Sequence, residues 1–348
     1  MAARRCPCCV FLSDDLFLPS HRDPSEETAV EKPINSEKAI VTISPNLLQE
    51  IASFVLDTHS HAHLERLEED QDYTTSSFAD KTGVALVTCA VAVDDWDLCL
   101  NYAAQSTAIV PAIGVHPWYC EQLLDDSKWL DRLEELIQEH PGCIVGEIGL
   151  CKIARWVRNH GDGRTVAMDG QRRIFVQQLQ LAGKYQRPVS VHCVQQHGVL
   201  LQILQEQVAD PQQRLPPSIA LHSFTGTAHH VKKLLQLEQQ QHCQTKFYFG
   251  FSHTVNYAMC TSEKSRRQTK EAILAVPPDR LLVESDVHRT DAVLNGTIQA
   301  LAYVAQVLGG DEGSFALAKV ARDTHANGLE FLRRGSSRRM TDPSKDDS

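Results

Sequence analysis

The chain has 348 residues, of which 42% are hydrophobic and 22% charged, as in an ordinary globular protein. Its formal net charge of -10 at pH 7 argues against a broad, non-specific grip on nucleic acid. The N-terminus lacks the apolar core of a secretory signal, and no apolar run has the length needed to cross a membrane. These features predict a protein of the cytoplasm or the nucleus, with its 11 scattered cysteines reduced.

The two ends of the chain differ in composition from its middle. Residues 1–50 are predicted to form a partly irregular N-terminal extension, because they are largely polar and interrupted by prolines. Residues 333–348 are rich in Ser, Arg and Asp and are predicted to form a disordered polar tail. The folded domain is therefore expected over residues 51–332. Three cysteines near the start are too closely spaced for an ordinary zinc site and are predicted to be exposed and reduced: Cys6, Cys8 and Cys9.

Eight short apolar runs follow one another through the predicted domain. They show no polar alternation, which favours strands that are buried on both faces of a parallel sheet. Because longer helical or polar stretches separate them, a closed, TIM-like (β/α)8 barrel is favoured over an open doubly wound sheet. No Gly-x-Gly-x-x-Gly follows the first run, which weakens a dinucleotide-binding interpretation. The runs are Ile51–Leu56, Val84–Val91, Ile109–Val115, Cys143–Ile148, Pro188–Val191, Ile219–Leu221, Lys246–Phe251 and Arg280–Val283.

Four segments between or after these runs have the apolar spacing of helices. Asp169 is expected to cap the first of them, Gln171–Tyr185, because a carboxylate accepts hydrogen bonds from the free N–H groups of a first helical turn. The others are Val231–Leu237, Thr297–Leu308 and Phe315–Leu332.

Polar residues stand where the predicted strands end. In a parallel barrel the carboxyl ends of all strands open onto one face, so residues far apart in the sequence are expected to meet there. His59 and His61 lie two residues apart, and on an extended strand both imidazoles point to the same side and can bind one divalent ion. A lone histidine at a strand end is more simply a hydrogen-bonded residue, but several at successive ends favour a metal site. The other members of the set are Asp57, His116, Glu147, His192, His222 and Asp286.

A carboxylate such as Glu147 or Asp286 can bridge or complete a metal site, and His192 and His222 suit a second ion. Paired ions polarise a phosphoryl or carbonyl oxygen and lower the pKa of water towards neutrality. The remaining histidines of interest are predicted to be surface residues or outer neighbours of the site: His63, His197, His229 and His230.

In their order and spacing these residues resemble the TatD family of metal-dependent deoxyribonucleases, over about residues 51–332. The chain is more closely similar to a eukaryotic, largely fungal branch, named for an interaction with a component of the anaphase-promoting complex. That branch is indicated by residues 188–195, by residues 249–252 with 255–256, and by residues 282–288. The family motifs are Asp57-Thr58-His59-Ser60-His61, Gly114-Val115-His116-Pro117, Gly146-Glu147-Ile148-Gly149-Leu150, His222-Ser223-Phe224-Thr225-Gly226 and Glu284-Ser285-Asp286, with Asn327 near the end of the last helix.

The resemblance implies a role for each matching residue. His59, His61, Glu147 and Asp286 would bind the first of two divalent ions, and Glu147, His192 and His222 the second, with Glu147 bridging. Asp286 would also be the general base, Asp57 would hold an imidazole ligand in its tautomer, and His116 would stabilise charge near the substrate. The ions could be zinc, magnesium or manganese.

The chain departs from the family pattern at a few positions around this set. Many members have Asp where this chain has Cys151, Arg where it has Val194, and His where it has Trp118. The usual Pro after the final Asp is also absent, since Val287-His288-Arg289 follows. The altered positions are those expected to recognise phosphate or orient ligands, so the resemblance supports metal-dependent hydrolysis more firmly than DNA cleavage.

A basic segment follows the predicted fourth strand. Lys152 and Arg155 could contact phosphates while Trp156 stacks on a base, and Arg155 is the preferred phosphate contact. An ordinary solvated loop whose arginines offset the acidic surface explains the segment equally well.

Three functions are compatible with the sequence, and a TatD-like deoxyribonuclease that hydrolyses phosphodiesters with metal-activated water ranks first. A different metal hydrolase ranks second, acting on an ester or amide bond such as the aminoacyl ester of tRNA, because one fold supports several reactions. A partner-binding protein with weak catalysis ranks third, favoured by Cys151, Val194 and the acidic charge.

Overall fold

The structure is a computed structural model, and it describes residues 43–67, 84–309 and 313–334. The cluster of Cys6, Cys8 and Cys9, most of the predicted extension and most of the predicted tail lie outside the described residues. The limits proposed for the three parts of the chain therefore stay predictions.

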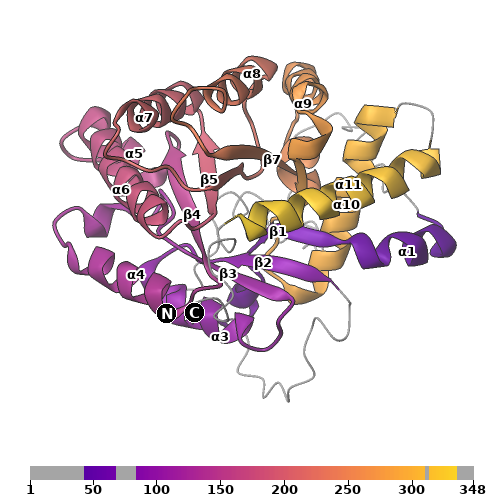
Figure 1. Cartoon of the computed structure of the whole chain (residues 1–348), viewed down its shortest axis with the longest axis horizontal. Coiled ribbons are helices and arrows are strands. Elements are labelled where there is room, and N and C mark those ends of the chain that lie inside the picture. Colours follow the sequence, from indigo (N-terminus) through magenta and orange to yellow (C-terminus); the bar gives the residue numbers. More distant parts are fainter. Residues whose placement is uncertain (1–42, 68–83, 310–312, 335–348) are drawn as a thin grey trace, which may run out of the picture.

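Eight parallel strands follow one another in sequence order around a single sheet (Figure 1). The last strand returns to the first, where the Asp286 N–H donates to the His59 carbonyl at 3.0 Å and the His61 N–H donates to the Val287 carbonyl at 2.8 Å. This arrangement confirms the predicted TIM-like (β/α)8 barrel. The strands are β1 (Leu56–Ser60), β2 (Ala85–Cys89), β3 (Ile109–Ile113), β4 (Ile144–Cys151), β5 (Val189–Val194), β6 (Ser218–Leu221), β7 (Lys246–Ser252) and β8 (Leu281–Glu284).

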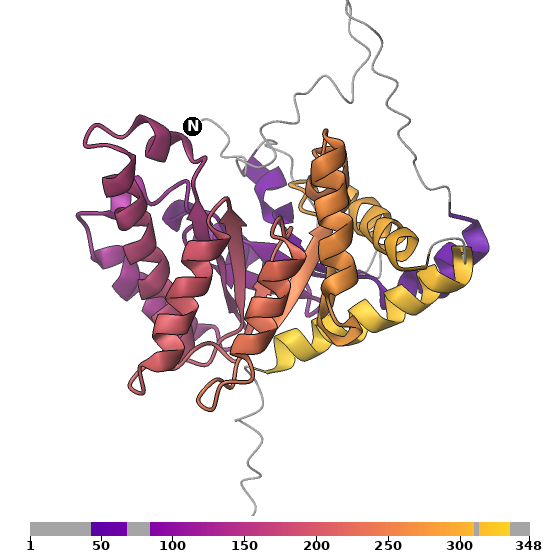
Figure 2. The ribbon, with the colours of Figure 1, turned by 90° about the horizontal axis from the view of Figure 1, so that it is seen from above.

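Helices surround the barrel, as Figures 1 and 2 show. They are α1 (Pro45–Ile51), α3 (Trp96–Ala103), α4 (Lys128–Glu139), α5 (Arg155–Asn159), α6 (Arg164–Lys184), α7 (His197–Ala209), α8 (Ala228–Leu237), α9 (Glu263–Ala275), α10 (Thr290–Gly309) and α11 (Gly313–Arg333). Short helical turns add η2 (Ala52–Phe54), η3 (Ala62–Leu67), η4 (Val93–Asp95), η5 (Glu121–Leu123), η6 (Thr254–Ala258) and η7 (Pro278–Arg280).

Two local predictions were wrong. The run Ile51–Leu56 is not a strand, because Ser44 caps helix α1 through its side chain, Pro45 occupies the first helical turn, and β1 begins only at Leu56. Asp169 does not cap a helix either, because α6 already begins at Arg164. The apolar run indicated a strand and Asp169 indicated a helix start. In both cases residues outside the predicted segment set where the helix or strand begins.

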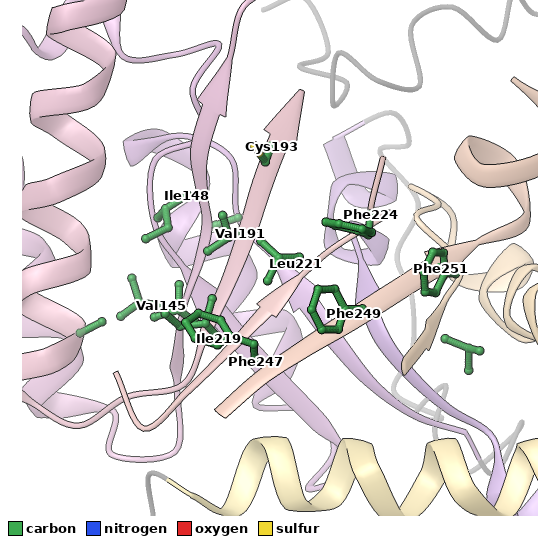
Figure 3. Packing of buried hydrophobic residues seen from close by; sticks show 14 of the residues in the cluster. Val145, Ile148, Val191, Cys193, Ile219, Leu221, Phe224, Phe247, Phe249 and Phe251 are labelled. Atoms are coloured by element: carbon green, nitrogen blue, oxygen red, sulfur yellow. The ribbon is translucent and has the colours of Figure 1, made fainter. Parts of the chain in front are cut away.

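Apolar side chains fill the space on both sides of the sheet. Between the strands and the outer helices, β7 contributes Phe247, Phe249 and Phe251, whose spacing of two places them on one face (Figure 3). Inside the barrel, the ring centroid of Phe331 on α11 lies 5.7 Å from that of Tyr248. The Phe331 carbonyl accepts a hydrogen bond from the hydroxyl of Ser218, the first residue of β6. Helix α11 therefore closes the amino-terminal end of the barrel and leaves the carboxyl end for the polar residues.

Helix α10 is long and apolar enough to cross a membrane by length and composition alone. Half of the relevant segment is buried, and the helix packs against α11, β7, β8 and β1. Packing within the barrel therefore accounts for its apolar residues, as in the core helix of a globular domain.

Gly149 of β4 lies opposite His192 of β5. Its φ of +151° is rarely adopted by other residues, and an added Cβ would lie 1.9 Å from the His192 carbonyl oxygen. We expect Gly149→Ala to lower the free energy of unfolding by about 3 kcal/mol, because neither backbone can yield. Urea denaturation measures this effect. Gly198→Ala is the control, since a Cβ there meets no atom within 4 Å, and equal losses in the two variants would contradict the account.

Candidate metal centre

The barrel brings together polar side chains that the sequence scatters from Asp57 to Asp286. Glu147 lies in the middle of β4, while His59 and His192 lie on β1 and β5. Asp57 also lies on β1, and His61 and His222 directly follow β1 and β6. Asp286 and His116 lie two and three residues beyond the ends of β8 and β3. All of them are at least 95% buried, which is unusual for so many ionisable groups. The set is Asp57, His59, His61, His116, Glu147, His192, His222 and Asp286.

The Glu147 carboxylate is the centre of this cluster, and five imidazoles face it. The closest contacts are made by the second pair of predicted ligands, His192 and His222, each with a ring nitrogen 2.8 Å from Oε1. Nε2 of His59 and Nε2 of His61 both lie 3.4 Å from Oε2. His116, predicted only to lie near the substrate, also comes within 3.4 Å of Oε1. One carboxylate thus contacts both predicted sets of ligands.

The ligand atoms form three overlapping groups, in each of which the donor atoms lie within 4.8 Å of one another. The groups are His59, His61 and Asp286; His59, Glu147 and His222; and His116, Glu147 and His192. The described residues therefore include clusters that can bind metal, as predicted.

The outer nitrogens of the imidazoles are held by groups behind them. His61 Nδ1 lies 2.7 Å from the Cys89 carbonyl oxygen. Because a carbonyl only accepts, Nδ1 carries the hydrogen of a neutral ring, and the lone pair of Nε2 faces the centre. His59 Nδ1 lies 2.9 Å from Ser190 Oγ. In the second set of predicted ligands, His222 Nδ1 lies 3.4 Å from Glu284 Oε1. Metal-binding histidines are commonly oriented in this way.

The ring nitrogens and carboxylate oxygens that face the centre are suited to bind a cation, and their close approach is unfavourable without one. His59 Nε2 and His61 Nε2 are 3.3 Å apart, and His192 Nδ1 and His222 Nε2 are 3.2 Å apart. Glu147 Oε2 is buried without a hydrogen bond. Lone pairs and carboxylate oxygens that converge away from water are costly unless a positive charge lies between them. The donor set of imidazole and carboxylate suits zinc, manganese or magnesium.

The pKa values follow from burial and from the shared carboxylate. Burial opposes ionisation of Glu147, but the surrounding imidazoles outweigh it and hold the pKa well below its usual range. Burial holds the pKa of His116 well below its ordinary value, so this ring is neutral. Burial acts against the charged form of His192 as well, yet the contacts with Cys151 and Glu147 outweigh it and raise the pKa to about 9. The centre therefore attracts a positive charge beside Glu147.

Asp57 does not touch an imidazole, so the tautomer role predicted for it does not fit the structure. Its carboxylate accepts hydrogen bonds from the His59 N–H at 3.1 Å, the Ser285 N–H at 3.0 Å and the Ser285 hydroxyl at 2.5 Å. Asp57 thus ties the carboxyl end of β8 to β1. Next to this junction Asp286 has a φ of +56°, and Ser223 has a φ of +38°. Two of the four non-glycine residues with a positive φ in the described part of the chain therefore lie beside the site.

The basic segment after β4 is only partly what the sequence suggested. Lys152 and Arg155 are exposed, but Trp156 is buried, and its indole N–H donates to the Pro117 carbonyl oxygen at 2.8 Å. A tryptophan held in this way supports the packing of α5. Its ring is buried, so the predicted stacking of Trp156 on a base does not fit the structure. Its place in a basic loop gave no indication of this burial.

Several residues around the centre were missed or misplaced by the sequence patterns. His63 was predicted to be a surface residue or an outer neighbour of the site; it is fully buried with a ring nitrogen 2.8 Å from Thr88 Oγ1, which leaves the second alternative. Ser190 precedes His192 by two residues and therefore points to the same side of β5, a spacing that could have indicated its role. Glu284 lies within a recognised motif, whereas Cys89 contributes a backbone carbonyl, which leaves no mark on the sequence.

Comparisons with known proteins agree with this geometry. The metal-dependent hydrolase YjjV of Escherichia coli is 24% identical over 243 residues, covering 69% of this chain and 81% of that protein. Its solved structure matches 81% of this chain and 98% of its own with a TM-score of 0.58 at 21% identity, which shows the shared fold. The Cut9-interacting protein scn1 of Schizosaccharomyces pombe is 25% identical over 257 residues, covering 53% of this chain and 73% of that protein.

A third relative carries the name of an enzyme activity. The 3'-5' ssDNA/RNA exonuclease TatD of Escherichia fergusonii is 29% identical over 178 residues, covering 50% of this chain and 55% of that protein. The family model of TatD related DNases matches residues 56–310, which hold every predicted metal ligand. Because that match spans well over half of the chain, this protein belongs to the TatD related DNase family of metal-dependent hydrolases, as its motifs predicted.

Proposed function

We propose that the chain is a nuclease that removes nucleotides from the 3' end of single-stranded nucleic acid with the help of two divalent ions. The observation that carries this proposal is the position of Glu147, one buried carboxylate in contact with two sets of imidazoles. A bridging carboxylate is what a paired-metal site requires. The polarity and the single-stranded substrate rest on the name of the relative from Escherichia fergusonii.

Each residue has a defined task in this proposal. His59, His61, Glu147 and Asp286 would hold one ion, and Glu147, His192 and His222 the other. When bound, the two ions polarise the phosphoryl oxygens and offset the charge that develops on them.

The proton is moved by Asp286. Its Oδ2 accepts a hydrogen bond from Ser223 Oγ at 3.3 Å, and its Oδ1 lies 3.7 Å from His61 Nε2. A carboxylate oriented by the Ser223 hydroxyl can take a proton from the attacking water in a fixed direction. His116 would face the leaving group as a neutral donor or acceptor.

Hydrolysis of end-labelled single-stranded DNA and RNA tests the proposal. We expect release of mononucleotides from the 3' end with added manganese or magnesium, and loss of that release with a chelator. The double variant His59→Ala/His61→Ala should lose this activity too, because only the carboxylates of Glu147 and Asp286 would remain to bind the first ion. If folded, metal-loaded protein turns over an aminoacyl or simple ester but no nucleic acid, the second hydrolase function replaces the nuclease. Circular dichroism of the variant controls for folding.

Arg155 and Lys152 are proposed to contact the phosphates of the substrate, since both are exposed on the segment that directly follows β4. We expect Arg155→Ala to raise KM about fivefold at low salt with kcat nearly unchanged, because an exposed cation contributes through long-range attraction that salt screens. Arg322→Ala on α11, at the closed end of the barrel, is the matched control. Steady-state kinetics at two salt concentrations decide the matter, and an equal KM in both variants would contradict the contact.

A role in binding a protein partner is the second candidate, because the chain is similar to the Cut9-interacting protein scn1. Location in the cytoplasm or nucleus, predicted from the sequence, suits both functions. The two are separated by the double variant His59→Ala/His61→Ala. A binding role predicts that a defined partner complex survives these substitutions, in a protein that turns over none of the substrates above.

A further inference from the structure

Two departures from the family pattern meet in the structure. Cys151 ends β4 and Trp118 lies in the loop after β3, 33 positions earlier. The Trp118 indole N–H donates to the Cys151 sulfur at 3.1 Å. Cys151 is 1% exposed. The two substitutions therefore form one contact at the edge of the metal centre, and they need a joint explanation.

A rigid frame holds this contact in place. Gln171 of α6 is fully buried, and its Oε1 accepts a hydrogen bond from the Cys151 N–H at 2.7 Å. Its side-chain amide donates to the Pro117 carbonyl oxygen at 3.0 Å, which also receives the Trp156 indole N–H. One side chain thus fixes both the end of β4 and the loop that carries Trp118. The position of the sulfur is set by fully satisfied buried hydrogen bonds.

His192 is the proposed metal ligand nearest to this contact, and the group that faces its outer ring nitrogen has to be identified. Its Nδ1 faces the centre, 2.8 Å from Glu147 Oε1, while Nε2 is buried and has no hydrogen-bond partner among the described residues. The outer nitrogens of His59, His61 and His222 have oxygen atoms behind them, and that of His116 accepts the Trp118 N–H. The candidate to face this nitrogen is Cys151, on the neighbouring strand β4. Strand pairing places the two close together, since Gly149 is opposite His192 and Cys151 follows two residues later.

We propose that Cys151 is a positioning residue for His192: its sulfur accepts the Nε2 hydrogen of the imidazole, and Trp118 holds the sulfur in place. A sulfur atom accepts hydrogen bonds weakly, and a second donor and a rigid frame compensate by fixing its position. The contact keeps the hydrogen on Nε2 and directs the Nδ1 lone pair towards Glu147. This inference rests on the proposed metal-dependent function.

Cobalt binding by the full chain tests the inference without relying on turnover. Affinity is measured by competition with a chelator, stoichiometry by metal analysis, and coordination by the visible spectrum of bound cobalt. We expect Cys151→Ala to weaken the second cobalt ion about 10- to 100-fold and to alter its spectrum. Cys151→Ser, whose hydroxyl oxygen also accepts, should restore the affinity to within about fivefold of the wild type.

Cys193→Ala is the matched control. Cys193 is also buried, lies directly after His192, and points into the core between the sheet and the helices (Figure 3). We expect this variant to bind both ions within about threefold of the wild type. Equal binding by Cys151→Ala and the wild type, or equal losses in the two alanine variants, would overturn the positioning role. Failure of the wild type itself to bind cobalt would instead overturn the proposed function. If Cys151→Ala does not fold, Cys151→Asp takes its place and is expected to bind both ions.

Discussion

Replacing Glu147 by glutamine should weaken binding of both divalent ions by about a thousandfold. The carboxylate contacts both sets of imidazoles and is completely buried. Removing one partner from a buried charge cluster typically costs about 3–5 kcal/mol, and each 1.4 kcal/mol is a factor of ten in affinity. Calorimetric titration with manganese measures this change, and the same variant should show no detectable nuclease activity.

The control for Glu147 is Glu134→Gln, which makes the same chemical change on α4 at the surface. Glu134 contacts Lys184 at 2.5 Å and Tyr185 at 2.6 Å, away from the centre. Its loss should leave manganese binding unchanged, because exposed pairs contribute little. A Glu147→Gln variant that loses only one ion would mean that the carboxylate does not bridge.

Asp286→Asn should lower kcat by about a thousandfold while the protein keeps its metal. The amide has nearly the same shape and retains an oxygen that can bind an ion, but it cannot take a proton from water. General-base catalysis contributes about 100- to 10,000-fold, so the loss should fall in kcat rather than in KM. Single-turnover cleavage of a labelled oligonucleotide, with metal content measured on the same sample, isolates this step.

Asp291→Asn is the matched control for Asp286. Asp291 lies five residues further on, at the start of α10, where it is paired with Arg289 at the surface. Its kcat should equal that of the wild type. If Asp286→Asn keeps full activity with both ions bound, the proton is taken by another group. If it loses metal as well as activity, Asp286 acts mainly as a ligand.

The convergence of the proposed metal ligands was predictable because strand geometry is local and repetitive. His59 and His61 are recognisable because they lie two residues apart at the end of an apolar run. A parallel barrel brings the carboxyl ends of all its strands together. Glu147 was equally visible, because an ionisable residue inside an apolar strand is rare. The same local logic failed at Ile51–Leu56, where an apolar run is shared between a capped helix and the start of a strand.

The residues that orient the ligands were not predictable in this way. Ser190 contacts His59 across 131 positions, and Trp118 contacts Cys151 across 33, so both contacts depend on the register between strands and on loop conformation. The burial of Trp156 also depends on a long-range partner, the Pro117 carbonyl. Side-chain identity indicates which chemistry is present, whereas packing decides which group supports it.

Anomalous X-ray scattering from crystals of the manganese-loaded full chain tests the central claim most directly. The account predicts two peaks about 3.5–4 Å apart on either side of Glu147, one beside His59 and His61 and the other beside His192 and His222. A single peak at this cluster, or peaks only elsewhere on the folded protein, would contradict the paired-metal centre.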